Sequence, residues 1–223
     1  GFIVMSCMGV IYFQVKDELP RIPKNLRYLN QQPPTEIYSS DGKVLKILGD
    51  RSYMTLDLIS PHFQKAIIAV EDSTFYEHHG LDPVAILRAF YKNTVKGKTA
   101  QGGSTITQQL AKNLFFSFEK SYERKLKELL MAFQIESTFS KQEILEAYAN
   151  QVYFGKGAYG IKRASYVYFG KNPSELSLLQ SAVLAAIPKS PNKVNPINNK
   201  EASIQRASYV LKRMVEEEYI DEN

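Results

Sequence analysis

Hydrophobic residues recur at helical spacing along most of the chain after position 60. Behind Ser60, apolar residues at i, i+3, i+4 and i+7 form one face: Phe63, Ala66, Ile67 and Val70. Ser60 suits the N-cap and Pro61 the first helical position. Comparable patterns predict helices that begin near Asp82 and Ser104, and others at roughly 121–138, 141–153, 160–168, 174–187 and 200–219. On the last of these, the stripe consists of Ile204, Ala207, Leu211, Met214 and Val215. The pattern therefore predicts a mainly α protein.

The region before Ser60 follows a different pattern. Residues 17–34 contain four prolines and few periodic apolar positions, which is typical of a connector. In "TEIYSSDGKVLKIL", β-forming residues flank a turn at Asp41 and Gly42, which predicts a short β hairpin. We therefore divide the chain into residues 1–15, a linker with the hairpin at 16–59, and a helical domain at 60–223.

Residues 1–15 are uncharged and largely apolar. They are shorter than the roughly 20 residues of a membrane-spanning helix, and they lack the basic start and cleavage site of a signal peptide. We interpret them as the outer part of a transmembrane anchor; the alternative is an ordinary buried helix.

Composition excludes several classes of function. The net charge of +5 fits anionic partners, although a solvated basic surface accounts for it equally well. Cys7 is the sole cysteine, so an intrachain disulfide is impossible. The three histidines lack metal-ligand spacing, which disfavours a zinc site. Basic residues are scattered and do not form a stripe with aromatic residues, so we expect no nucleic-acid partner.

The stretch "EDSTFYEHHG" at 71–80 places an acid directly after an apolar run. On a continuing helix, the neighbours of Glu71 one turn away are Ile68 and Phe75. A carboxylate in apolar surroundings holds a proton more readily, which is how a catalytic base is poised near neutral pH. The alternative is a Glu71 that points into solvent or pairs with a basic residue.

Two more stretches place polar groups at helical spacing. In "QGGSTITQQLAKN" (101–113), Thr105 and Gln108 fit a capping box, and the Gly-rich entry is able to bind an anion; a plain capped helix explains both features equally. In 122–136, apolar residues line two opposite faces, so we expect a central helix. One face has Leu126, Leu129, Leu130 and Phe133, and the other has Arg124, Glu128, Met131 and Ile135. Arg124, Lys125 and Glu128 would then lie together in a poorly hydrated place.

The stretch from 144 to 171 has a core face and a polar face. The core face consists of Ile144, Leu145, Tyr148 and Val152, and the polar face of Glu146, Asn150 and Tyr153. Aromatic residues and glycines alternate from 153 to 170. This alternation fits a wall that stacks on sugar rings, and it fits core packing with tight turns equally well.

Together these stretches resemble the peptidoglycan glycosyltransferase (transglycosylase) domain of class A penicillin-binding proteins, the family 51 glycosyltransferases. The matching motifs follow in order: EDxxFxxHxG from Glu71, GSTITQQ with Lys112 and Asn113, RKxxE from Arg124, and ILExYxN from Ile144. "ELSLLQSAVLAAIPKSPN" resembles the family's closing helix and Pro-rich turn. The resemblance covers about residues 20–220.

The resemblance implies a lysozyme-like large lobe at 60–223 and a small membrane-associated jaw lobe at roughly 82–122. It also implies a single-span anchor in the cytoplasmic membrane, with the domain on its periplasmic or outer face. The expected partners are lipid II, the growing lipid-linked glycan, the membrane and the cell-wall synthesis machinery.

The implied reaction is polymerisation of lipid II with inversion at the anomeric carbon. Glu71 matches the family's general base and Glu128 its second glutamate, which acts on the donor side, with a divalent cation (Mg²⁺ or Mn²⁺) as a possible aid. No organic cofactor is implied. Lys112, Arg124 and Lys125 match the cations that face the leaving pyrophosphate. Other matching positions would line the cleft: Asp72, Ser104, Thr105, Gln109 and Asn150, and more weakly Lys120, where relatives can carry Arg.

Two alternatives stay open at this point. A lysozyme-like enzyme that cleaves peptidoglycan also uses a cleft glutamate, but it needs no cationic pyrophosphate site. A non-catalytic scaffold module of the cell-wall machinery would tolerate loss of Glu71.

Overall fold

The computed structural model of the protein describes residues 16–27, 35–48, 53–87, 91, 103–116 and 121–222. The expected anchor at 1–15 and the site candidate Lys120 lie outside these residues. No helix in the described ranges is both long enough and apolar enough to cross a membrane.

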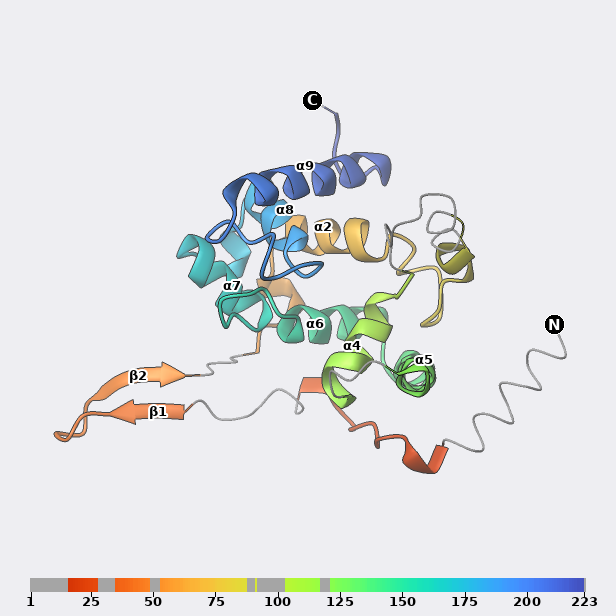
Figure 1. The fold of residues 1–223 in the computed structure, drawn as a ribbon, viewed down its shortest axis with the longest axis horizontal. Helices are drawn as coiled ribbons and strands as arrows, with labels where there is room; N and C mark the ends of the chain where they lie inside the picture. Colours follow the sequence, from red (N-terminus) through yellow and green to blue (C-terminus); the bar gives the residue numbers. More distant parts are fainter. Residues whose placement is uncertain are drawn as a thin grey trace, which may run out of the picture.

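The described part of the chain is mainly helical, which confirms the predicted fold class. Figure 1 shows α9 lying across α8 and α2, with α4, α5 and α6 on the other side of α2. The longer helices are α2 (Pro61–Glu71), α4 (Ile106–Phe115), α5 (Tyr122–Thr138), α6 (Lys141–Gln151), α7 (Gly160–Phe169), α8 (Leu178–Ala186) and α9 (Lys200–Glu216). Short 3-10 turns cover Lys16–Glu18, Leu56–Leu58 and Pro173–Glu175.

Two strands, β1 (Thr35–Tyr38) and β2 (Val44–Leu48), pair in an antiparallel sheet. Thr35 lies opposite Leu48, and the register shifts near Tyr38. The connecting turn contains Gly42 at a positive φ of 81°. Figure 1 shows this hairpin extending to one side of the helices.

Helix α2 is the central element of the core. Phe63, Ala66 and Ile67 are fully buried, and α2 packs against both α8 and α9. Ser60 is the N-cap residue and Pro61 occupies the first turn, both as expected, but the Ser60 side chain makes no capping hydrogen bond. Its hydroxyl donates instead to the Leu176 carbonyl at 3.0 Å, which joins the start of α2 to the segment before α8.

The buried faces of two helices differ from their predicted positions. On α5, Glu128, Met131 and Ile135 are buried, whereas the leucine stripe, including Leu126 and Leu129, is only half-buried apart from Leu130. On α9, the buried residues are Ser203, Ala207, Val210 and Met214, and the predicted Ile204 is 53% exposed. On α9, the buried stripe is therefore displaced by about one residue from the predicted stripe, because α8 and α2 cover the displaced face.

Helix α6 begins with a true capping box between Ser140 and Glu143, and it is buried from Ile144 to Gln151. The expected core face of α6 is confirmed. Its polar face is buried as well, since Glu146 and Asn150 are each 7% exposed. These two side chains bind the extended segment that precedes α2.

Among the glycines that the structure describes, Gly160 at the entry to α7 lies closest to the backbone of another element. Gly160 has a φ of 76°, and a Cβ atom there would lie 2.5 Å from the Asn150 carbonyl oxygen. Gly157 also has a positive φ, of 70°, but has open space around it. Substitutions at the two glycines can therefore distinguish the energetic cost of a left-handed backbone, which both share, from the cost of a steric clash, which only Gly160 would add.

We predict that Gly160→Ala lowers the free energy of unfolding by about 3 kcal/mol, and Gly157→Ala by about 1 kcal/mol. Both variants pay for the positive φ, but only Gly160→Ala also forces α6 and α7 apart. Denaturant titration monitored by circular dichroism would measure both values. Equal losses in the two variants would contradict the role assigned to the α6–α7 contact.

Candidate functional site

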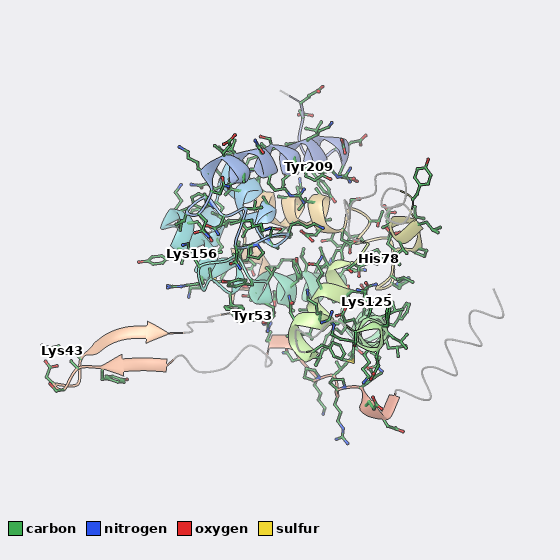
Figure 2. All side chains as sticks on the ribbon, viewed as in Figure 1. Lys43, Tyr53, His78, Lys125, Lys156 and Tyr209 are labelled. Carbon is green, nitrogen blue, oxygen red and sulfur yellow. The ribbon has the colours of Figure 1, made fainter. Side chains whose placement is uncertain are left out.

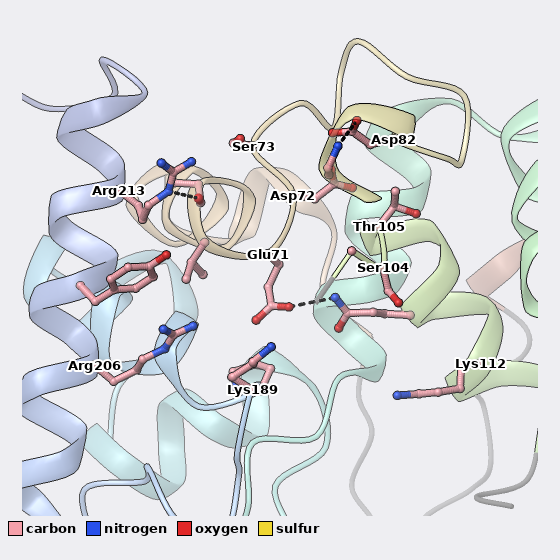
Figure 3. Close-up of a pocket in the computed structure, with 17 residues that line it drawn as sticks. Glu71, Asp72, Ser73, Asp82, Ser104, Thr105, Lys112, Lys189, Arg206 and Arg213 are labelled. Carbon is pink, nitrogen blue, oxygen red and sulfur yellow. Dashed lines mark hydrogen bonds between the residues drawn. The ribbon is translucent and has the colours of Figure 1, made fainter. Parts of the chain in front are cut away.

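A cavity of about 320 Å³ opens between the C-terminus of α2, the N-terminal half of α4, the loop after α8, and α9. Figure 3 shows Glu71 near its centre, with Lys112 on the α4 side and Arg206 on the α9 side. Its polar and charged lining residues are Glu71, Asp72, Ser73, Asp82, Ser104, Thr105, Gln109, Lys112, Lys189, Arg206, Tyr209 and Arg213.

Glu71 is the last residue of α2, and its side chain faces the cavity. The helix expected to continue past Glu71 ends there, so Phe75 lies in the following turn and not one helical turn away. Ile68 and Phe75 are both buried, but Glu71 itself is only partly buried. Gln109 Nε2 donates a hydrogen bond of 2.8 Å to Glu71 Oε2 (Figure 3). One carboxylate oxygen is therefore anchored by this amide, while the side chain stays accessible from the cavity.

Tyr148 fixes the orientation of that amide. Its hydroxyl donates to Gln109 Oε1 at 3.2 Å, which leaves Nε2 directed at Glu71. Complete burial, followed by the charges of Glu71 and Asp72, raises the pKa of Tyr148 well above 10. The hydroxyl thus remains a donor at every physiological pH. The sequence analysis treated Tyr148 as a core residue only, and the signal it missed was a hydroxyl on an otherwise apolar face.

Asp72 is buried and holds the site together. Its carboxylate accepts from the Ile106 backbone N–H at 2.9 Å, at the N-terminus of α4, and from His78 Nε2 at 2.9 Å. His78 Nδ1 in turn accepts from the Gly80 N–H at 3.2 Å, so this ring carries its proton on Nε2. Asp72 touches the cavity, but its oxygens are occupied by these structural contacts.

The Gly80 carbonyl receives two further bonds from the start of α4. Thr105 Oγ1 donates to it at 2.8 Å and Gln108 Nε2 at 3.1 Å. Thr105 does cap α4 by accepting from the Gln108 N–H, but the predicted reciprocal capping box is absent because the Gln108 side chain turns to Gly80. At Gly80, where φ is 85°, a Cβ would lie 3.1 Å from the Ala132 backbone, so α5 also packs against this loop.

Glu128 is only 2% exposed and lies between two cations. Lys125 Nζ lies 3.0 Å from Oε2, and Arg124 Nε lies 2.9 Å from Oε1 at angles that make an ion pair rather than a hydrogen bond. The structure thus brings together Arg124, Lys125 and Glu128, as the sequence analysis expected. The described residues contain no group of three His, Cys, Asp or Glu side chains placed to hold a metal ion.

Only Glu128 of this triad is buried, and the exposed Lys125 connects the triad to the cavity. Its ammonium also donates to Ser104 Oγ at 2.9 Å and contacts Gln108 Oε1 at 3.3 Å. Ser104 lines the cavity, and so does the half-buried Lys112. Among the described residues, no carboxylate pairs with the Lys112 ammonium, which leaves it available to an anion.

The predicted site residues therefore fall into three groups. Glu71, Asp72, Ser104, Thr105, Gln109 and Lys112 line the cavity, and the triad of α5 adjoins it. Asn150 does not line the cavity: its amide accepts from the Met54 N–H and donates to the Met54 carbonyl, both at 2.8 Å. Asn150 thus fixes the segment before α2, and its expected place in the cleft is corrected.

Sequence reasoning missed four cavity residues after α8: Lys189, Arg206, Tyr209 and Arg213. The Arg206 guanidinium lies 4.5 Å from the centre of the Tyr209 ring. Arg213 Nε donates to the Ala69 carbonyl at 3.3 Å, which fixes α9 against the end of α2. Charged residues spaced along a surface helix are typical of a solvent-exposed face, so the local sequence gave no indication that these residues line a cavity.

The chain is similar to known proteins along most of its length. The family model described as "Transglycosylase" matches residues 41–215. "Penicillin-binding protein 1A" of Aquifex aeolicus is 46% identical over 99% of this chain and 31% of its own length. The protein of the same name from Escherichia coli is 44% identical over 94% of this chain and 25% of its own length.

A crystal structure of Penicillin-Binding Protein 1A from Haemophilus influenzae aligns with a TM-score of 0.48 and 25% identity, covering 86% of this chain and 19% of that chain. The chain spans at most about a third of the length of the relatives cited. With a family model over most of its length and relatives above 40% identity, the chain belongs to the transglycosylase family found in class A penicillin-binding proteins.

Proposed function

We propose that this chain is a peptidoglycan glycosyltransferase that polymerises lipid II into glycan strands. The observation that carries the proposal is Glu71, an accessible carboxylate in a cavity whose other walls present Lys112 and Lys189. A base flanked by cations suits transfer of a sugar from a pyrophosphate leaving group to a hydroxyl. The transglycosylase family match supports the same reaction.

In the proposed step, the 4-hydroxyl of the GlcNAc on lipid II attacks C1 of the donor MurNAc. The new O4–C1 bond forms as the C1–O bond to the lipid pyrophosphate breaks, and the configuration inverts from α to β. Glu71 takes the hydroxyl proton, and the bonding electron pair leaves with the pyrophosphate. Gln109, itself held by Tyr148, keeps the carboxylate of Glu71 aimed into the cavity.

The cations on the α4–α5 side would stabilise the leaving group. Lys112 lines the cavity directly, and Lys125 reaches its wall at Ser104. Glu128 has both oxygens facing cations, so we assign it to holding Lys125 and Arg124 in place. A divalent cation beside Glu128 stays a prediction of the family resemblance, and no step of the proposed reaction runs through it.

We further propose that a jaw lobe at roughly 82–122 contacts the membrane. Asp82 and Ala85 line the cavity, while Val84 and Leu87 on the same short helical segment are 62% and 68% exposed. Tyr91 is 69% exposed as well. Exposed apolar side chains beside the cavity suit a substrate whose lipid chain stays in the bilayer. This lobe, the lysozyme-like arrangement and the single-span anchor remain parts of the proposal.

We predict that Glu71→Gln lowers the rate of strand synthesis from purified lipid II in detergent by at least about a hundredfold, because the amide accepts no proton. Its midpoint of thermal unfolding should change little, since Glu71 is partly exposed and, among the described residues, accepts a single hydrogen bond, from Gln109. Gel separation of labelled glycan strands would measure the rate.

Two outcomes would contradict this assignment. Activity retained in Glu71→Gln would exclude Glu71 as the base. A wild type that makes no strands would favour a scaffold role. Release of muropeptides from polymeric cell wall by the wild type, in place of strand synthesis, would favour a lysozyme-like hydrolase.

Glu128→Gln should behave differently from Glu71→Gln. It leaves Arg124 and Lys125 near a buried neutral amide, so we predict a loss of about 1–3 kcal/mol in the free energy of unfolding together with reduced synthesis. Denaturant titration and the strand assay on the same preparations would separate the two effects. Full stability in Glu128→Gln would contradict the role of Glu128 as the partner of these cations.

The membrane proposal is tested with Leu87→Asp. We predict weaker binding to phospholipid vesicles in a flotation assay, because a charge at this position opposes insertion among the acyl chains. Leu179→Asp is the matched control, since Leu179 is 61% exposed on α8, away from this segment. Equal effects of the two substitutions would place the lipid contact elsewhere.

A further inference from the structure

The aromatic and glycine residues of 153–171 divide into two sets in the structure. Phe154 is fully buried, which accounts for part of the alternation as core packing. Tyr159 and Tyr166 are 41% and 66% exposed, and core packing does not explain them. The same stretch contains Lys156, Lys162, Arg163 and Lys171 and no Asp or Glu.

The loop that begins this stretch is closed by a backbone hydrogen bond and presents the exposed Lys156. Gly155, Lys156 and Gly157 all have positive φ angles, of 79°, 52° and 70°. A left-handed backbone is unusual for lysine, so the surrounding structure imposes it. Phe154 and Ala158 close the loop, since the Phe154 N–H donates to the Ala158 carbonyl at 2.8 Å.

Two tyrosine rings flank this loop. The rings of Tyr153 and Tyr159 lie 4.7 Å apart between centroids, and their backbones form a β-bridge. Next along α7, a hollow of about 210 Å³ is lined by Lys162, Arg163, Tyr166, Lys171, Asn172 and Pro173. The lining residues include three cations and no carboxylate, so charge complementarity favours an anionic occupant.

This surface is connected to the cavity through a single loop. Pro188 and Lys189 line the cavity, and the carbonyl of Pro191 lies 2.6 Å from where a Cβ of Gly155 would stand. Figure 2 shows Lys156 on the side of the molecule opposite His78. A polymer that leaves the cavity past Lys189 and follows this loop toward Gly155 would reach Lys156 and then α7.

We propose that the tyrosine–lysine surface, defined as Lys156, Tyr159, Lys162, Arg163, Tyr166 and Lys171, binds the glycan strand outside the cavity. Exposed tyrosine rings pack against the CH faces of sugar rings, and the cations bind carboxylates of the stem peptides. A polymer of alternating sugars and acidic peptides offers both chemistries at short intervals. The proposal rests on the proposed function for the identity of the strand, and it adds a site that holds product during successive additions.

Calorimetric titration with uncrosslinked glycan oligomers that retain their stem peptides tests the site without turnover. We expect Tyr166→Ala and Arg163→Ala each to weaken binding about fivefold. Lys156→Asn should do the same at low salt, because asparagine tolerates the left-handed backbone while removing the charge. The matched controls are Tyr122→Ala, at a side chain 99% exposed on α5, and Lys24→Asn at another exposed lysine.

Two further probes separate the two chemistries. Oligomers stripped of their peptides should bind more weakly and lose their sensitivity to Arg163→Ala, but keep their sensitivity to Tyr166→Ala. Poly-glutamate tests charge alone. If poly-glutamate binds as tightly as the oligomers, or if the variants bind oligomers like wild type, the proposal is overturned.

Strand synthesis gives an independent readout. The surface variants should consume lipid II at the initial wild-type rate but release shorter strands, since product escapes sooner. A protein that binds oligomers through this surface yet makes no strands would refute the proposed function alone. A protein that makes strands of wild-type length in all surface variants would refute this inference alone.

Discussion

The site depends on the hydrogen bonds that the buried carboxylate of Asp72 accepts. Left unpaired, a buried carboxylate would cost several kcal/mol, so its partners are obligatory. It receives the first N–H of α4 and the ring of His78, and His78 in turn receives the N–H of Gly80. One side chain thus fixes the end of α2, the loop that follows it and the start of α4. These are the elements that carry Glu71, Gln109 and Lys112.

Around this contact, the protein separates charges that hold structure from charges that face the cavity. Glu128 is buried and compensated by Arg124 and Lys125, whereas Glu71 is bound to a neutral amide and keeps its access. The cation Lys112 likewise faces the cavity without a carboxylate partner among the described residues. Two glutamates of the same chemistry therefore acquire different roles from their surroundings.

Local patterns in the sequence predicted the helices well, because apolar periodicity and capping residues act within a few positions. Helix α5 begins and ends within one residue of its expected bounds. The errors concern partners distant in sequence. Ile204 was placed on the buried face because periodicity cannot tell which neighbouring helix covers α9. Asn150 was placed in the cleft because nothing local reveals that Met54 lies against it. Lys189 and Arg206 reach the cavity only through the packing of α8 and α9 on α2.

As the proposed base at the end of α2, Glu71 has two opposing requirements. It would need access from the cavity to reach an incoming hydroxyl, yet an unrestrained glutamate samples many rotamers. Burial of Glu71 itself would restrict the rotamers but close the access. The structure instead buries Tyr148, which orients Gln109, which restrains Glu71. The restraint comes from a side chain in the core, and the Glu71 carboxylate remains at the surface of the cavity.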